Sequence, residues 1–284
     1  MTDAPPVRRR LAGAALRRFR EQAGCTIDDA ARLLACDRSK ISRIETGQRG
    51  IRPGELRDLL AGYGVDGPRR NGLLAIARHG RQAGWWQSGS HAADDGYHGL
   101  IGLAGAGTCV WAYDPQLVPA LLQTGDYARA IAAASLIHES SDQREQFVRA
   151  RLSWQQVLTR EEEPLPFWAI LGEGALRQMT GGRQVMRDQL RHLVDTGTGQ
   201  PNVTVQVLPF AAGAHAAASG PFVVMRFAEA PGLGVVCLAG QTGGIYLEKP
   251  EEVARYTLAF EHLRASALST AATVRLIGQV TAAL

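Results

Sequence analysis

The chain has 284 residues, of which 45% are hydrophobic, so its length suits roughly two domains with buried cores. No run of about 18 apolar residues suggests a transmembrane helix, and no apolar signal segment follows the N-terminal arginines, so we expect a cytoplasmic protein with no membrane partner. The charge is uneven. Residues 1–84 hold 17 Lys and Arg against 9 Asp and Glu, a net charge of +8, and the remainder carries −4. A basic head of this kind suits phosphate binding.

Residues 9–23 have the apolar spacing of a first helix, which we expect to end at Gly24. Two short helices joined by a tight turn are predicted between Thr26 and Gly47. Thr26 and Asp29 have the spacing of a capping box that opens the first, and Gly47 stands where a left-handed residue would end the second. This is the layout of a DNA-binding helix-turn-helix. The alternative is an ordinary helical hairpin with a solvated basic face.

The second short helix combines inward apolar positions, Ile41 and Ile44, with an outer polar and basic face. We expect five side chains of this face to contact base edges in the major groove: Arg38, Ser39, Lys40, Ser42 and Arg43. Arg43 fits either a base or a phosphate. We expect three further residues to hold phosphates: Thr26, Arg49 and Arg52. For each single arginine the alternative is a solvated surface charge.

The run SRIETG (residues 42–47) resembles the pattern of the XRE, or Cro/cI-like, helix-turn-helix family. The resemblance implies a structural salt bridge between Arg20 of the first helix and Glu45. Two positions depart from the family's pattern. Ile27 replaces a Gln, which removes a phosphate contact, and Ala35 replaces the Gly of the turn. If the backbone at Ala35 is left-handed, alanine costs on the order of 1 kcal/mol relative to glycine.

Pro53 is well placed to open a fourth helix, and residues 71–81 have the pattern of a fifth. We therefore expect residues 1–82 to form an all-α, five-helix domain that binds DNA. Residues 83–99 would be a linker, because they are rich in Gly, Ser, His and Asp without a periodic pattern. A regulatory or interaction domain would follow over residues 100–284.

The second domain alternates helical and strand-like patterns. Helical periodicity occurs in six segments: 118–134, 141–160, 173–179, 183–195, 251–267 and 272–283. Four runs rich in β-branched and aromatic residues predict strands: 167–171, 203–208, 222–227 and 234–238. The fold class is therefore mainly α, with an all-α domain followed by an α+β domain that contains a small, mainly antiparallel sheet.

Three segments of this second domain resemble the C-terminal domain of a large family of actinobacterial regulators with an XRE-type head. They are VPALLQTGDYARA (residues 118–130), NVTVQVLPF (residues 202–210) and YLEKPEEVARY (residues 246–256). Members of that family are described as antitoxin-like and are commonly encoded beside a small toxin-like partner. The resemblance implies transcriptional regulation. On it we place a partner or effector surface at Leu121, Leu122 and Gln123.

Motifs of catalysis are absent from the sequence. It contains no G-x-S-x-G elbow, HExxH motif, P-loop or dinucleotide fingerprint, so we expect no enzyme, no catalytic residues and no cofactor. The four cysteines form no pair with metal-ligand spacing, so we expect no metal site.

We therefore expect a sequence-specific transcriptional regulator that binds double-stranded DNA as a homodimer. A partner protein or a small molecule would control it through the second domain. The alternative is an antitoxin-like protein that neutralises a small toxin-like partner and binds DNA to regulate its own synthesis.

Overall fold

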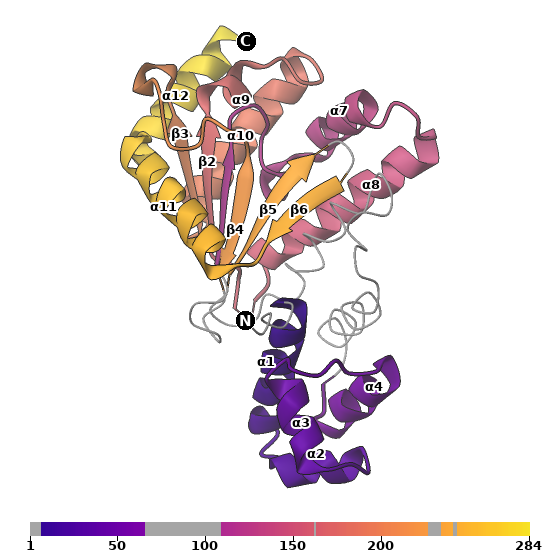
Figure 1. Ribbon diagram of the computed structural model, residues 1–284. Helices are drawn as coiled ribbons and strands as arrows, with labels where there is room; N and C mark the ends of the chain where they lie inside the picture. The colour runs from indigo at the N-terminus through magenta and orange to yellow at the C-terminus, as the bar shows by residue number, and fades with distance from the viewer. Residues whose placement is uncertain (1–6, 66–108, 162, 227–233, 241–242) are drawn as a thin grey trace. The chain divides into compact units, whose positions relative to one another are not determined.

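The computed structural model describes residues 7–65, 109–161, 163–226, 234–240 and 243–284 (Figure 1). The chain divides into two compact units, one formed by Met1–Thr108 with Arg226–Pro250 and the other by Cys109–Met225 with Glu251–Leu284. The fifth helix predicted at 71–81 and the linker predicted at 83–99 lie outside the described residues.

Residues 7–65 form four helices around one apolar core. The helices are α1 (Val7–Gln22), α2 (Ile27–Leu33), α3 (Arg38–Glu45) and α4 (Pro53–Gly62). Each helix contributes buried side chains to this core, among them Leu16, Phe19, Ala30, Ile41, Ile44, Leu56, Leu59 and Leu60. Fully burying one such leucine or isoleucine contributes roughly 1.5–3 kcal/mol. The predicted helical layout of this segment is confirmed.

The helix ends follow the local signals in the sequence. At α2 the capping box is formed, because the Asp29 N–H donates to Thr26 Oγ1 at 3.1 Å and the Thr26 N–H donates to Asp29 Oδ2 at 2.8 Å. Gly24, which follows α1, and Gly47, which follows α3, have φ values of 68° and 74°. Gly24 therefore ends α1 as expected, and Gly47 has the left-handed backbone predicted for the end of α3. Asp37 occupies the N-cap of α3, but its side chain makes no capping hydrogen bond.

The second half of the chain contains a six-stranded sheet in the order β3-β2-β1-β4-β5-β6. The strands are β1 (Cys109–Asp114), β2 (Phe167–Gly172), β3 (Val203–Leu208), β4 (Phe222–Arg226), β5 (Gly234–Gly240) and β6 (Gly243–Leu247). β2 pairs in parallel with both β1 and β3, with Trp168 opposite Trp111 and Thr204. β5 and β6 pair antiparallel, with Cys237 opposite Tyr246.

The predicted α+β class is confirmed, and the sheet is mixed: β2 pairs in parallel with β1 and β3, and β5 pairs antiparallel with β6. β1 and β6 were not among the predicted strands. Helices connect β1 to β2 and β2 to β3, and strands joined through such crossovers pair in parallel. β1 was missed although its run CVWAYD favours a strand, because it stands at the start of a region dominated by helical patterns. β6 begins with two glycines, which weaken a strand signal.

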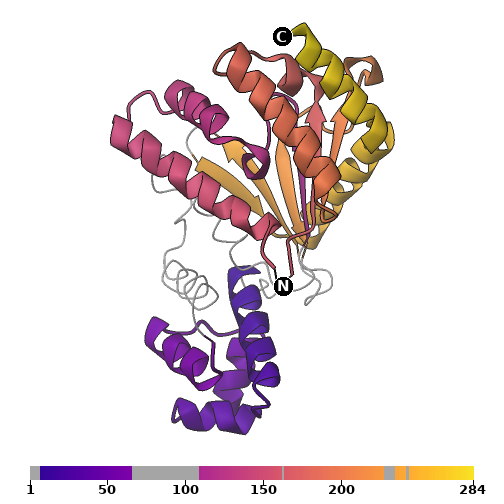
Figure 2. The same cartoon turned by 180° about the vertical axis from the view of Figure 1, so that it is seen from behind.

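Helices surround the sheet. They are η2 (Ala120–Leu122), α7 (Gly125–Ser135), α8 (Ser141–Trp154), η3 (Gln155–Leu158), α9 (Glu173–Arg177), α10 (Arg183–Gly199), η4 (Phe210–Ala212), α11 (Pro250–Ser266) and α12 (Thr270–Ala283). α11 covers one face, where Trp111 stacks on Phe260 with ring centroids 5.1 Å apart. Figure 2 shows α10 on the opposite face. At the β3 edge, the Leu268 N–H donates to the Val207 carbonyl at 2.9 Å, so the chain just before α12 closes that edge.

The helix predicted at 118–134 is two elements instead of one. η2 is a short 3₁₀ turn, and Gln123 after it is extended, with φ −80° and ψ 138°. Thr124 then caps α7, because its Oγ1 accepts a hydrogen bond from the Tyr127 N–H at 3.3 Å. A proline before the turn and a threonine cap after it interrupt an apolar pattern that by itself suits a continuous helix.

Candidate nucleic-acid interface

α3 has one buried side and one exposed side. Ile41 and Ile44, which are 1% and 2% exposed, anchor it in the core. Four of the five side chains predicted to contact bases point to solvent: Arg38, Ser39, Ser42 and Arg43. Because the isoleucines fix the rotation of the helix about its axis, the exposed residues form a continuous polar face along it.

The Arg20–Glu45 salt bridge implied by the family resemblance is present. The two side chains, 8% and 6% exposed, meet through two hydrogen bonds, from Arg20 Nε to Glu45 Oε1 at 2.7 Å and from Arg20 Nη2 to Glu45 Oε2 at 3.0 Å. Arg20 Nη1 also donates to the Cys25 carbonyl at 2.9 Å. The hydrogen bonds to Glu45 raise the pKa of Arg20. The bidentate pair fixes the last turn of α3 to α1, and the third hydrogen bond joins Arg20 to the residue just before the N-cap of α2.

A glycine that was not among the predicted functional residues allows α1 to approach the end of α3 closely. A Cβ atom at Gly13 would lie 2.4 Å from the Ile44 carbonyl oxygen and 2.5 Å from that of Glu45. Both distances are shorter than any real contact of a Cβ atom, so only glycine permits this approach. The available signal was a glycine in the middle of an alanine-rich helix, where it normally lowers stability.

Lys40 differs from the other predicted base-contacting residues. Its side chain is 18% exposed, and its Nζ lies 2.7 Å from Oε1 of Glu55 in α4, which is 23% exposed. Glu55 Oε2 also accepts a hydrogen bond from the Arg52 N–H at 3.2 Å. Partial burial opposes ionisation of Glu55, but the hydrogen bonds from Lys40 and Arg52 outweigh it, so the pKa of Glu55 lies below its ordinary value.

The residues predicted to hold phosphates are exposed: Thr26, Arg49 and Arg52. The Thr26 hydroxyl belongs to the capping box: it donates a hydrogen bond to Asp29 Oδ2 and accepts one from the Asp29 N–H. Hydrogen bonds from the Thr26 hydroxyl, the Thr26 N–H and Arg32 lower the pKa of Asp29 to about 2. The first turn of α2, whose N-terminal amides are the groups that would bind a phosphate, therefore carries two acidic side chains, Asp28 and Asp29.

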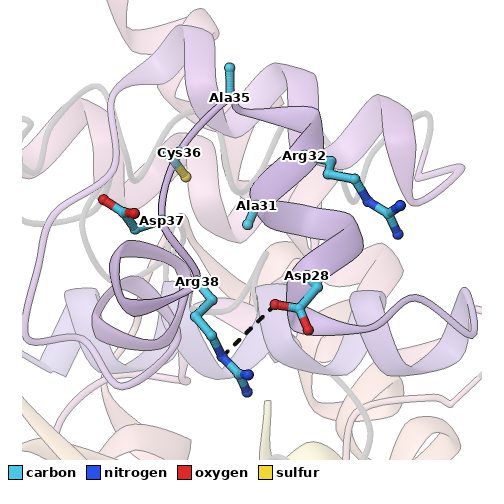
Figure 3. Close-up of a pocket in the computed structure, with 7 residues that line it drawn as sticks. All are labelled: Asp28, Ala31, Arg32, Ala35, Cys36, Asp37 and Arg38. Atoms are coloured by element: carbon cyan, nitrogen blue, oxygen red, sulfur yellow. Dashed lines mark ion pairs between the residues drawn. The ribbon is translucent and has the colours of Figure 1, made fainter.

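A shallow hollow lies between α2 and α3 (Figure 3). Its lining consists of Asp28, Ala31, Arg32, Ala35, Cys36, Asp37 and Arg38. Arg38 Nε is 3.9 Å from Asp28 Oδ1, and these side chains are 71% and 63% exposed. A long ion pair between such exposed groups contributes little, so Arg38 can leave it at low cost when another partner is offered.

The turn between α2 and α3 contains the strain that the sequence suggested. Ala35 has φ +46°, in the left-handed region. Alanine stands there where glycine would adopt the same conformation without the steric penalty of a Cβ atom. The turn is nevertheless held by backbone hydrogen bonds, including the Cys36 N–H to the Ala31 carbonyl at 2.9 Å.

The partner or effector surface predicted at Leu121, Leu122 and Gln123 is wrong, because these residues are 2%, 0% and 3% exposed. Gln123 Nε2 donates to the Val118 carbonyl at 2.7 Å, and Gln123 Oε1 accepts from Arg151 Nη1 at 2.9 Å. These side chains form part of the interior and hold the turn itself. A motif in the sequence does not by itself distinguish residues that bind a partner at the surface from residues that hold a turn in the interior.

Gln189 of α10 completes this buried network. It is 0% exposed, its Oε1 accepts from the Thr124 N–H at 2.7 Å and its Nε2 donates to the Leu122 carbonyl at 2.7 Å. Both backbone groups belong to the break between η2 and α7, where no helix supplies partners. One amide side chain, 65 residues further along the chain than Thr124, therefore satisfies two backbone groups of the break.

Among the described residues, no helix is long and apolar enough to cross a membrane. In the same part of the chain, no group of three or more His, Cys, Asp or Glu side chains is arranged to hold a metal ion.

The four-helix arrangement and the exposed face of α3 define a helix-turn-helix protein. Residues 11–73 match the model of a helix-turn-helix domain, which indicates a DNA-binding regulator. Residues 101–279, more than half of the chain, match the model described as domain of unknown function (DUF5753), and the chain belongs to that family. Neither the curated proteins nor the solved structures contain a match.

Proposed function

We propose that this protein is a sequence-specific transcriptional regulator that reads the major groove of double-stranded DNA with α3. The observation that carries the proposal is the exposed face of Arg38, Ser39, Ser42 and Arg43 on a helix anchored by two buried isoleucines. Short polar side chains next to arginines suit base edges, since arginine can bind guanine O6 and N7 through two hydrogen bonds. The resemblance to the XRE family supports the same proposal.

The backbone of the DNA would be held beside this face. Arg49 and Arg52 lie in and at the end of the loop after α3, and both are exposed. Such contacts to phosphates set the position of the protein on the duplex without reading its sequence. The net charge of +8 over residues 1–84 supports this assignment, because a basic head attracts the duplex before any specific contact forms.

We propose further that the protein acts as a homodimer, with its second domain controlling when the heads bind. Each chain offers one recognition helix, and two helices on half-sites about 34 Å apart give the usual gain in specificity. A partner protein, such as a small toxin-like one, or a small molecule would change the availability or spacing of the heads. Sedimentation of the full chain with and without DNA tests the dimer, and a monomer in both would contradict it.

The test of DNA reading is selection of bound duplexes from a random pool by the full-length protein, followed by affinity measurements on the selected site. Arg38→Ala should relax the preference at one base pair, with a loss of roughly 1–3 kcal/mol on the selected site. Arg52→Ala should weaken all sequences alike and reduce the salt slope by about one. Arg191→Ala, in an exposed pair on α10, is the control and should change neither. Failure to enrich any sequence would overturn the proposal.

A further inference from the structure

Lys40 lies in the first turn of the proposed reading helix, yet its charge is already engaged within the protein. Its Nζ lies 2.7 Å from Glu55 Oε1, and both side chains are more than three-quarters covered. By contrast, Arg38 is 71% exposed and its nearest carboxylate is 3.9 Å away. Two cations of one helix thus have different environments, although the sequence suggests the same role for both.

Glu55 connects three parts of the head. Its Oε1 accepts from Lys40 in α3, and its Oε2 accepts from the backbone N–H of Arg52, the residue that precedes α4. Arg52 is also one of the residues proposed to hold a phosphate. The carboxylate therefore ties the start of α4, and with it Arg52, to the reading helix.

We propose that Lys40 is a positioning residue that acts through Glu55, and that it does not contact base edges. The proposal rests on the proposed function, because it concerns how the head presents itself to DNA. Lys40 holds Glu55, Glu55 holds the Arg52 backbone, and the loop that carries Arg52 keeps its place beside α3. Base preference is then left to Arg38, Ser39, Ser42 and Arg43.

Charge supports this division of roles. If Lys40 turned to a base, Glu55 would lose its ammonium partner and present an uncompensated carboxylate close to the phosphates, where negative charge repels the duplex. While Lys40 stays with Glu55, the pair is neutral and Arg52 remains the cation directed to the backbone. Leaving a partly buried carboxylate without its partner is unfavourable in itself.

The experiment first selects bound duplexes with the wild-type full-length protein, so that a failure of DNA reading is recognised before any variant is made. The affinity for the selected site is then measured for Lys40→Met, Glu55→Gln and the double variant. Glutamine at position 55 can still accept the Arg52 N–H, so Glu55→Gln removes mainly the ion pair. The selection itself is repeated with Lys40→Met and Lys40→Arg.

A positioning role gives four linked results. Lys40→Met and Glu55→Gln each weaken binding by about tenfold, and the double variant is no weaker than either alone. Lys40→Met and Glu55→Gln each lose affinity by the same factor for selected and for unrelated duplexes. The bases selected by Lys40→Met remain those of the wild type. Lys40→Arg keeps wild-type affinity and selects the same bases, because arginine can also pair with Glu55.

Direct contact with DNA gives opposite results, and any of them overturns the proposal. Glu55→Gln would strengthen binding, because it frees Lys40 and removes a negative charge. Lys40→Arg would move the selected sequence towards guanine at one position, since the two cations are not equivalent at a base edge. Additive losses in the double variant, or no loss with Lys40→Met, would equally contradict the proposal.

The matched control is the exposed pair of Arg191 and Asp188 on α10, joined at 3.2 Å. Arg191→Met and Asp188→Asn should leave affinity and selected bases unchanged. Thermal melting of every variant identifies those that fail to fold. Lys40→Arg, which keeps the ion pair, decides the question if Lys40→Met does not fold.

Discussion

The head (residues 7–65) and the second compact unit, the body (Cys109–Met225 with Glu251–Leu284), hold their buried turns and helices together with different chemistry. The head joins α1 to α3 through the charged pair of Arg20 and Glu45, whereas the body holds the turn between η2 and α7 mainly through the amides of Gln123 and Gln189. Both braces are buried. The comparison shows that a buried polar brace does not need two charges.

The helix starts repeat this contrast. The capping box of α2 pairs Thr26 with the carboxylate of Asp29, and the capping box of α8 pairs Ser140 with the neutral amide of Gln143. In the head, ionisable groups therefore hold both the helix start and the helix packing. We expect substitutions that remove charge to act more strongly on the head.

The largest effect is expected from removing one charge of the head's brace. Glu45→Gln leaves Arg20 as a buried guanidinium without its anion, so the head should lose roughly 3–5 kcal/mol. Hydrogen exchange of the α1 and α3 amides in the full chain measures this loss locally. Arg17→Gln, which removes the exposed partner of Glu21, is the control and should change exchange little. Unchanged exchange in Glu45→Gln would show that the pair is not a brace.

The corresponding change in the body is Gln189→Leu. It keeps the size of the side chain but leaves the Thr124 N–H and the Leu122 carbonyl without partners, at a cost of roughly 2–4 kcal/mol for the two groups. Hydrogen exchange at the start of α7 measures it. Gln184→Leu, on the exposed side of the same helix, loses only a bond to Asp188 and should have little effect. Equal effects of the two variants would mean that the amide brace contributes nothing.

A third variant tests how closely the head is packed around its charged brace. Gly13→Ala places a methyl group against the carbonyl oxygens of Ile44 and Glu45, so α1 and α3 must separate, at about 2–3 kcal/mol. Chemical denaturation of the full chain, followed by helical circular dichroism, measures the change. Gly54→Ala is the control: nothing lies within 4 Å of the added methyl, and alanine should stabilise α4 by about 0.5–1 kcal/mol. Tolerance of alanine at position 13 would contradict the close approach.

Ala35→Gly should stabilise the head, by about 1 kcal/mol, because glycine adopts the left-handed conformation at this turn without strain. The same exchange measurement detects slower opening of α2 and α3. Ala61→Gly, inside α4, gives the opposite sign and costs about 1 kcal/mol. If both variants destabilised the head, the strain at Ala35 would be refuted.

The smallest effect concerns pH and separates the two capping boxes. The pKa of Asp29 is lowered to about 2, so its stabilising contribution is complete above the ordinary pKa of aspartate, about 3.9, and is lost as the pH falls towards 2. NMR titration should place the carboxyl of Asp29 there, and Thr26→Ala should raise its pKa. The capping hydrogen bonds between Ser140 and Gln143 at the start of α8 should remain unchanged over this pH range.

The sequence determined the local features of the head. The capping box of Thr26 and Asp29, the left-handed glycines at 24 and 47 and the inward isoleucines of α3 all depend on spacings of a few residues. Within that distance, backbone geometry by itself fixes which groups meet. The left-handed backbone at Ala35 was suggested instead by the glycine that the resembling family carries at this turn.

The contacts between distant segments were decided only by the tertiary structure. Lys40 meets Glu55, Gly13 meets the carbonyl of Ile44, and Gln189 meets the turn after η2, because packing brings those segments together. The Arg20–Glu45 pair was foreseen only from a family resemblance, because the two residues are 25 positions apart and nothing in the segment between them dictates the contact. Whether a side chain contacts a partner at the surface or holds the interior together depends on its burial. Burial is set by the packing of all segments, so it cannot be inferred from neighbouring residues alone.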